Sequence, residues 1–534
     1  MKKFLVSVLV LVLSLSLLVP AFAEYDPIGF YDGEVKLPLT DTPVTFTRFF
    51  NMDAAKISPT TDNFGTIECY KLLEEKTGVH IEFIHPPIGQ EKEKFNLMIA
   101  SDELPDMIHY NWGSYSGGPQ KAIDDGIILR LNDLIDQYCP NLKYIIDNNA
   151  DVKKAISTDS GDIYCFPYLM INQLVNGTYG YQLRADWLEE LGLAVPESIE
   201  DWYNVLNAFK TKGTNAAGSP IIPLVSMNPS YNQCAVRRFA NAWGIDYDFY
   251  QMNNAVGYGP YTNAYKDYLT TMKKWYEEGL IDIEFPTCDE ATHDAKVTAG
   301  TAGAWLNGIG AGMGKYIKAF DGHYELIKAS KYPVVNKGDT IYSGFVGQIF
   351  AGGAGTAIST SCKDPALAAK WLDYHYSRDG HMILNWGIEG VSYELDANGV
   401  PHVTDLMRNH PNGYSIDVAL CLYTMGASSE AYCQDPNIRT TRFWNTPTQE
   451  EATTLWADVT SIMLPALSYS NEESEELTSI MSEINTYRDE MFLKFVLGTE
   501  PIENFDKYIA QMKSMGMDRA LEIRQAALDR YNDR

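Results

Sequence analysis

A large aromatic residue stands at the mouth of a loop of small residues in the stretch LPDMIHYNWGSYSGG, residues 104–118. The apolar run through Met107 and Ile108 ends in Asn111 and Trp112, and Gly and Ser residues follow. Tryptophan usually buries its large surface in a core, so this position indicates an exposed ring on which a flat ligand can lie. The amide of Asn111 offers hydrogen bonds beside it. The alternative interpretation is a Trp that wedges the loop onto its own core.

The motifs of common enzyme and metal sites are incomplete in this chain. GIGAGMG at 308–314 has the spacing G-x-G-x-G-x-G and not G-x-G-x-x-G, so it predicts a flexible loop instead of a dinucleotide site. DANGV at 396–400 resembles the start of a calcium loop, but position 12 is Met407, which favours a hairpin turn. There is no H-E-x-x-H and no G-x-S-x-G. We therefore predict no cofactor and no metal ion.

The first 23 residues have the composition of an export signal. Lys2 and Lys3 precede an apolar run over residues 4–19, and Ala-Phe-Ala at 21–23 is a cleavage site of the A-x-A type. The run is shorter than the roughly 20 apolar residues of a membrane-spanning helix. We expect an exported chain that begins at Glu24 and resides outside the cell or in the cell envelope or periplasm. Because no cysteine stands at the cleavage site, the lipobox of a bacterial lipid anchor is missing.

Charge, length and cysteine pattern restrict the class of protein. The formal charge is −28, and removal of the signal with its two lysines moves it to about −30. Such a surface repels phosphate backbones and anionic lipids, so nucleic-acid and membrane-surface binding are poor candidates. The eight cysteines form no C-x-x-C pair, which argues against zinc and redox motifs and leaves disulfides open. A chain of 534 residues exceeds one core, so two lobes or domains are expected.

Strands and helices alternate in the order that a parallel α/β unit requires. VTFTRFF at 44–50 and VHIEFIHP at 79–86 alternate like strands, and GTIECYKLLEEKTG at 65–78 predicts an amphipathic helix that ends at a Gly cap. The stretch EKEKFNLMIASDELPDMIHY at 91–110 predicts a further helix followed by a strand, and Asn111 lies at the end of that strand. This order predicts an α/β lobe with a mostly parallel sheet, whose ligands bind at the carboxyl ends of the strands. MINQLVNG, residues 170–177, has no strong period and suits a crossing between lobes.

The ordered set of sequence pieces resembles a known family. The pieces are LPDMIHYNWG, GDIYCFPYL, YQLRADWLEELGLAVPESIEDWYNVLNAFK, TAGAWLNG, CKDPALAAKWLDYHYSRDGHMILNWGIEGVSYELDANG and FDKYIAQMKSMGMDRALEIRQAALDRY. Their order is similar to that in the carbohydrate-type extracellular solute-binding proteins of ABC importers, family 1. Within this family the chain resembles the long branch that includes lipoprotein LplA and the alginate-binding proteins. No single motif is diagnostic, but together they cover nearly the whole mature chain.

The resemblance implies a two-lobed periplasmic-binding-protein fold of type II, α/β in class, with discontinuous lobes joined by hinge strands. On this basis we expect lobe 1 at residues 24–175 and 330–385, and lobe 2 at residues 176–329 and 386–534 with a helical C-terminal region. The resemblance also implies a monomeric receptor that captures oligosaccharides in the cleft, does no chemistry, and delivers them to the permease subunits of an ABC importer. Most Gram-positive relatives carry a lipobox Cys, which this chain lacks.

The resemblance further implies which side chains face the cleft. A sugar needs flat aromatics for its C–H faces and polar side chains for its hydroxyls, and an unpaired buried polar group costs about 1–3 kcal/mol. The expected ligand-binding residues are Asn111, Trp112, Tyr179, Tyr181, Arg184, Trp305, Asn307, Trp386, Glu389, Tyr393 and Trp444. For Trp305 the alternative is a core position, and for Arg184 it is an ion pair with Asp186 or a nearby Glu.

Two other classes compete with this interpretation. A secreted glycoside hydrolase would share the signal, the aromatics and the acidic charge, and it would need two carboxylates about 5–10 Å apart. With 70 acidic residues, the sequence leaves such a pair open. A binder of peptides, lipids or other solutes on the same fold is the third class.

Overall fold

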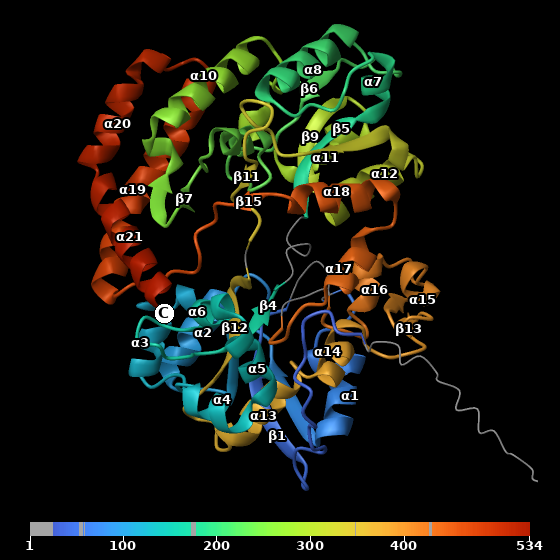
Figure 1. Ribbon diagram of the computed structural model, residues 1–534, viewed down its shortest axis with the longest axis vertical. Helices are drawn as coiled ribbons and strands as arrows, with labels where there is room; N and C mark the ends of the chain where they lie inside the picture. Colours follow the sequence, from blue (N-terminus) through green and yellow to red (C-terminus); the bar gives the residue numbers. More distant parts are fainter. Residues whose placement is uncertain (1–24, 53–56, 58, 172–177, 348, 427–429) are drawn as a thin grey trace, which may run out of the picture.

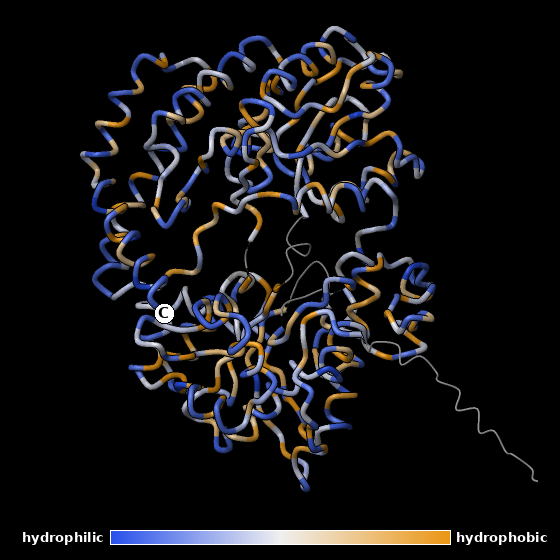
Figure 2. Tube along the Cα trace, in the orientation of Figure 1, coloured by the Kyte–Doolittle hydropathy of each residue, from blue (hydrophilic) through white to orange (hydrophobic). Residues whose placement is uncertain are grey.

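The computed structural model describes residues 25–52, 57, 59–171, 178–347, 349–426 and 430–534, which form two lobes, one above the other (Figure 1). The expected export signal, residues 1–23, and most of MINQLVNG lie outside the described residues. Within them, no helix combines the length and the apolar character of a membrane span. All eight cysteines are free thiols buried in the protein. Figure 2 shows hydrophobic segments inside each lobe.

Lobe 1, the lower one in Figure 1, is built on a five-stranded sheet with the order β2-β1-β3-β12-β4. The strands are β1 (Val44–Phe49), β2 (Val79–Ile84), β3 (Met107–Asn111), β4 (Phe166–Leu169) and β12 (Phe350–Ile358). β2, β1 and β3 are parallel as predicted, and β12 runs antiparallel between β3 and β4. The sheet is therefore mixed, because β12 enters from a distant part of the chain.

Helices cover both faces of this sheet. They are α1 (Glu68–Thr77), α2 (Glu91–Ser101), α3 (Gly118–Asp124), α4 (Asn132–Tyr138), α5 (Pro140–Asn148), α6 (Ala150–Ile156), α13 (Pro365–Tyr374) and α14 (Arg378–Asn385). α1 ends at Gly78 in the left-handed conformation with φ of 73°, which confirms the predicted Gly cap.

Lobe 2 contains a four-stranded sheet with the order β10-β5-β9-β6. The strands are β5 (Tyr179–Arg184), β6 (Ile222–Leu224), β9 (Ala302–Gly308) and β10 (Ile327–Ser330). β5 is antiparallel to β9 and β10, whereas β6 is parallel to β9. Because β5 starts where the chain arrives from lobe 1, Tyr179 lies at the interlobe end of the sheet and Arg184 at the opposite end.

The remaining elements of lobe 2 are mostly helical. The helices are α7 (Ala185–Glu190), α8 (Ile199–Lys212), α9 (Ala235–Arg238), α10 (Asn263–Glu277), α11 (Glu290–Thr298), α12 (Lys315–Ala319), α18 (Pro447–Ala457), α19 (Asn471–Val496), α20 (Phe505–Ser514) and α21 (Met517–Asp533). A hairpin of β7 (Phe249–Met252) and β8 (Ala255–Tyr258) contacts α21. The stretch GIGAGMG, predicted as a loop, instead forms a π-helical turn over Ile309–Gly314 that leads into α12.

A small third cluster lies beside lobe 1. Its elements are β13 (Tyr393–Leu395), β14 (Pro401–Val403), α15 (Asp405–Arg408), α16 (Ile416–Leu420) and α17 (Pro436–Phe443). DANGV joins β13 to β14, which confirms the predicted hairpin turn. Buried residues within 421–433, which the expected boundaries assign to lobe 2, pack in the core of lobe 1. The other expected boundaries stay predictions.

The core of each lobe is discontinuous in sequence, as the resemblance implied. The lobe 1 core combines residues from 46–170 with residues from 350–384 and 421–433, and the lobe 2 core combines residues from 181–332 with residues from 452–523. A short parallel pair, β11 (Tyr342–Ser343) with β15 (Thr460–Ser461), lies where the chain passes between the lobes. After β15, residues 462–470 run as an extended segment to α19. We call this segment the strap.

Candidate functional site

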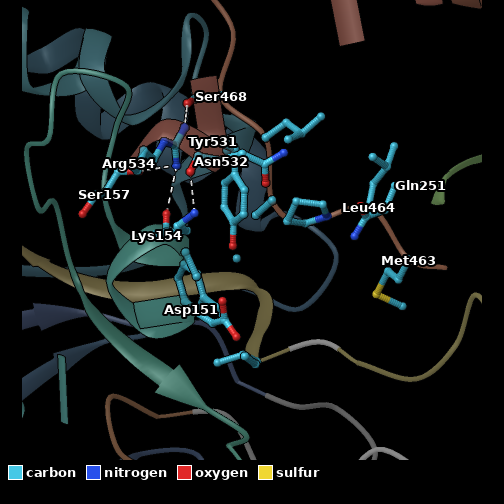
Figure 3. A pocket seen from close by; sticks show the side chains of 18 of the residues that line it. Asp151, Lys154, Ser157, Gln251, Met463, Leu464, Ser468, Tyr531, Asn532 and Arg534 are labelled. Atoms are coloured by element: carbon cyan, nitrogen blue, oxygen red, sulfur yellow. Dashed lines mark hydrogen bonds between the residues drawn. The ribbon is translucent and has the colours of Figure 1, made fainter. Parts of the chain in front are cut away.

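A cavity of about 630 Å³ lies between the two lobes and takes its walls from both of them (Figure 3). Lobe 1 contributes the end of β3, the first residues of β12 and one face of α6. Lobe 2 contributes the β7–β8 hairpin, the strap and the end of α21. This volume falls in the range of roughly 300–1,000 Å³ that small-molecule sites occupy in proteins. We refer to it as the interlobe cavity.

Asn111 reaches the cavity because β3 ends there. It is the last residue of the strand, its side chain is exposed, and the turn of Gly113 and Ser114 that follows also lines the cavity. Gly353 in the neighbouring β12 has φ of +68°, and a side chain there would come within 3.2 Å of the Asn111 carboxamide oxygen. A glycine at this position therefore keeps space open around the amide.

The hairpin in the lobe 2 wall presents two further carboxamides, those of Gln251 and Asn254. Asn253 and Asn254 form its turn with φ of 53° and 62°, as the two-residue turn between twisted strands requires. Gln525 of α21 clamps this turn, because its carboxamide accepts from the Val256 N–H at 2.8 Å and donates to the Asn254 carbonyl at 3.0 Å. Gln251, in β7, also lines the cavity.

The carboxamide side chains that line the cavity are free to form hydrogen bonds with a ligand. Among the described residues, no hydrogen bond involves the side chains of Asn111, Gln251, Asn254 and Asn532, all of which line the cavity. Each carboxamide offers two N–H donors and a carbonyl acceptor, which matches the mixed donor and acceptor character of a hydroxyl. The site can therefore bind a polar, hydroxyl-rich ligand from both lobes at once.

Helices α6 and α21 meet across the cavity through charged side chains (Figure 3). Lys154 of α6 donates to the Asn532 carbonyl at 2.5 Å. Arg534, whose side chain is only 4% exposed, donates to the carbonyls of Lys154 and Ser157 and forms an ion pair with Asp159 at 2.5 Å. These contacts join the end of lobe 2 to the α6 region of lobe 1.

Tyr531 places an aromatic ring against the cavity, beside Asp151 of α6 (Figure 3). Burial, reinforced by the negative charge of Asp151, raises the pKa of the Tyr531 hydroxyl to about 12. The hydroxyl is therefore protonated at neutral pH, and it can donate a hydrogen bond while the ring offers a flat apolar face.

The three tryptophans expected at the cleft lie in three separate cores. Trp112, Trp305 and Trp386 each have no exposed surface. Their indole N–H groups donate inside the protein, to the Gly355 carbonyl at 3.2 Å, the Gln182 carboxamide at 3.0 Å and the Asp435 carboxylate at 2.8 Å, respectively. In this conformation none of the three offers a ring face to a ligand, because each side chain is fully buried.

Tyr179, by contrast, is only partly buried, and it does not line the interlobe cavity as described. Its half-buried ring stacks on Phe345 with 5.7 Å between centroids and 17° between planes. The guanidinium of Arg238 lies 3.4 Å from the Phe345 centroid. Tyr181, two residues on, is fully buried and donates to the Ala235 carbonyl at 3.0 Å.

The structure places four other expected residues away from the interlobe cavity. Arg184 pairs with Asp186 at 2.5 Å at the far end of β5, which is the alternative interpretation of that residue. Asn307 is buried and donates to the Tyr316 hydroxyl at 2.6 Å. Glu389 is exposed in a turn, and Tyr393 is buried in β13.

Trp444 follows α17, where the chain passes from the small cluster to lobe 2. Its indole is half-buried and donates to the Thr453 hydroxyl at 2.8 Å. Of the eleven expected residues, Asn111 alone belongs to the walls of the interlobe cavity as described. The wall residues that sequence reasoning missed include Asp151, Lys154, Gln251, Tyr531 and Arg534. None of them stands in a sequence motif that marks it as a ligand contact.

The described residues contain no group of three or more His, Cys, Asp or Glu side chains that could hold a metal ion. The donor set of the cavity is instead dominated by carboxamides, hydroxyls and main-chain groups. Such groups suit hydrogen bonding to a neutral polar ligand better than they suit coordination of a hard cation.

Comparison with known proteins gives consistent relatives over most of the chain. The fructooligosaccharide ABC transporter substrate-binding protein FusA of Streptococcus pneumoniae is 25% identical over 511 residues, which is 91% of this chain and 90% of FusA. Lipoprotein LipO of Bacillus subtilis is 25% identical over 387 residues, 68% of this chain and 71% of LipO.

A solved structure shows the same architecture. The crystal structure of the alginate-binding protein AlgQ2 without calcium ion superposes with a TM-score of 0.70 at 26% identity, covering 92% of this chain and 99% of AlgQ2. The match confirms the two-lobed α/β fold of type II that the resemblance implied. The sequence signature of the family described as "Bacterial extracellular solute-binding protein" matches residues 61–382, and the chain therefore belongs to this family.

Proposed function

We propose that the protein is an extracytoplasmic receptor that captures oligosaccharides in the interlobe cavity and delivers them to an ABC-type sugar importer. The observation that carries this proposal is the set of uncommitted carboxamides, which converge on one cavity from both lobes. A ligand bound to Asn111 of lobe 1 and Gln251 of lobe 2 bridges the lobes and favours the closed arrangement. The names of FusA and AlgQ2 support a carbohydrate as this ligand.

The proposal includes export, partner and oligomeric state. Residues 1–23 direct export, and the chain acts outside the cytoplasm as a monomer. Its partners are the permease subunits of an importer, as the name of FusA supports. The word "extracellular" in the description of the family agrees with export.

The receptor is proposed to bind without chemistry. A glycoside hydrolase needs two carboxylates flanking the scissile bond. Among the described residues that line the cavity, Asp151 is the single acidic side chain. This donor set favours capture of an intact ligand over hydrolysis.

Isothermal titration calorimetry of the mature chain against a panel of oligosaccharides tests the proposal. Saturable binding of a glycan, together with a raised melting temperature and an unchanged glycan by chromatography, supports the receptor. Release of shorter products would instead establish a hydrolase. Binding of short peptides, with no binding of any glycan, would assign the protein to the peptide-binding class.

A further inference from the structure

The cationic side chains that line the interlobe cavity, Lys154 and Arg534, already donate hydrogen bonds to acceptors within the protein. Arg534 has five N–H groups, and all of them are used: Nε and Nη2 contact the Asp159 carboxylate, Nη2 also contacts the Ser468 hydroxyl, and Nη1 contacts two carbonyls. A guanidinium in this state has no free pair of N–H groups with which to bind a ligand carboxylate.

Asp159 remains ionised beside the two arginines that bind it. Burial raises its pKa, but hydrogen bonds from Arg534, Arg530 and Ser468 outweigh burial and hold the pKa below its usual value. The Asp159 charge therefore cancels that of Arg534 at neutral pH. Arg530 also pairs with Glu473 at 2.7 Å, so its charge is shared between two carboxylates.

Lys154 is the remaining cation among the described wall residues, and Asp151 offsets it. The Lys154 ammonium is held by the Asn532 carbonyl at 2.5 Å. Asp151 lies three residues earlier on α6, which places both side chains on one face of the helix. It is exposed at the cavity and forms no ion pair within the described chain.

From this arrangement we infer that the cavity selects neutral oligosaccharides and rejects uronic-acid oligosaccharides. The inference rests on the proposed function and names its substrate class. A uronate trimer carries three carboxylates, which would need free cationic donors, whereas the described wall residues offer one lysine and an opposing carboxylate. The free carboxamides match the hydroxyl groups that a neutral sugar presents around each ring. The net charge of the whole chain also repels an anionic ligand on approach.

Matched ligands of equal length test the inference. The probes are neutral trisaccharides, 1-kestose, maltotriose, mannotriose and xylotriose, together with trigalacturonate and trimannuronate, titrated calorimetrically at one ionic strength. We expect the best neutral trisaccharide to bind at least tenfold more tightly than either uronate. Equal or tighter binding of a uronate would overturn the inference and leave the receptor function intact. Binding of neither class would overturn the receptor function and the inference with it.

A charge-matched pair of variants assigns the selectivity to the cavity. Asp151→Asn removes one negative charge at the wall, and Glu82→Gln removes one from the exposed surface of β2, far from the cavity walls. We expect Asp151→Asn to raise the ratio of uronate affinity to neutral affinity several-fold and Glu82→Gln to leave that ratio within twofold of wild type. Equal ratios in the two variants would remove Asp151 as the source of selectivity. Melting curves of both variants verify that they are folded.

Discussion

Arg534, which directly follows α21, and Asp159 of lobe 1 form an ion pair at 2.5 Å that joins the two lobes. Arg530, one helical turn earlier, reaches the same carboxylate at 2.6 Å, and the Ser468 hydroxyl of the strap donates to it at 2.9 Å. α21 itself packs in lobe 2 through Ala520 and Ile523. The Asp159 carboxylate therefore accepts hydrogen bonds from three lobe 2 side chains, and these contacts link the lobes beside the cavity.

Asp159→Asn is expected to loosen this junction. The variant loses the charge that binds two arginines and leaves the nearly buried Arg534 without its counter-ion, at a cost of about 1–3 kcal/mol. Small-angle X-ray scattering of the ligand-free protein should show a larger radius of gyration, and the melting temperature should fall. High salt should reproduce part of the effect in the wild type because it screens partly exposed pairs.

Asp136→Asn is the matched control for this variant. Asp136 pairs with Lys143 within lobe 1, and their side chains are 63% and 42% exposed. Such a pair contributes about 0–1 kcal/mol, so scattering and melting should stay close to those of the wild type. If Asp159→Asn behaves like this control, the ion pair does not hold the lobes together.

The parallel half of the lobe 1 sheet could be predicted from the sequence because each strand carries its own signal. β1 and β2 alternate apolar and polar residues, and the helix between them ends at Gly78. β12 could not be found in this way, since FAGGAGTAI consists mostly of Gly and Ala and has no alternation. Its strand conformation depends on pairing with β3, where Ala354 lies opposite Asn111.

The candidate site could likewise be predicted only where a residue belongs to an element with its own local sequence pattern. Asn111 could be predicted because the end of a parallel strand is a ligand position in any α/β sheet. The orientation of Trp112 could not, because the acceptor of its indole N–H is the Gly355 carbonyl of the unpredicted β12. Tyr531 and Arg534 lie at the end of α21, almost 380 residues after Lys154 in the sequence. No local sequence pattern therefore connects these two residues with Lys154.

Glu430→Gln should destabilise lobe 1 strongly. Arg48 and Glu430 form an ion pair in which both side chains are 0% exposed, and the Tyr70 hydroxyl donates to the same carboxylate. Removal of one partner leaves a buried charge unpaired, which costs about 3–5 kcal/mol. Urea unfolding of lobe 1, followed by tryptophan fluorescence, measures the loss.

The double variant Arg48→Met/Glu430→Leu separates charge from packing. Replacement of both ions by apolar side chains of similar size is often close to neutral, so this variant should recover most of the lost stability. A double variant as unstable as Glu430→Gln would show that the polar network around Thr356 and Tyr70, and not the unpaired charge, dominates the loss.

Acid should destabilise lobe 1 between about pH 6.5 and pH 4 through buried histidines. Burial lowers the pKa of His375 to about 4 and that of His109 to about 3. The unfolded chain binds protons at these residues below about pH 6.5 and the folded chain does not, so stability present at pH 7 is lost as the pH falls. Burial raises the pKa of Asp373 to about 7, which acts in the opposite direction.

His375→Asn isolates one of these groups. The Asn Nδ2 can replace the imidazole Nδ1–H that donates to the Ala431 carbonyl at 3.0 Å. Between pH 6.5 and pH 5 the wild type should lose about 2 kcal/mol more unfolding free energy than the variant, at about 1.4 kcal/mol per pH unit. His402→Asn, at an exposed position of β14, should follow the wild type. Parallel pH profiles for His375→Asn and wild type would contradict a buried neutral His375.

Asn111→Ala should weaken oligosaccharide binding more than it lowers stability. Its carboxamide is exposed at the cavity, so its loss removes hydrogen bonds to the ligand, worth about 1–3 kcal/mol or roughly 5- to 150-fold in Kd. Trp112→Phe should do the reverse, because the indole is fully buried and donates to Gly355. Calorimetry well below each melting temperature separates affinity from stability, with Asn148→Ala on the exposed side of α5 as the matched control. A larger loss of affinity in Trp112→Phe than in Asn111→Ala would mean that the bound state exposes the indole, and it would restore Trp112 as the surface on which the sugar stacks.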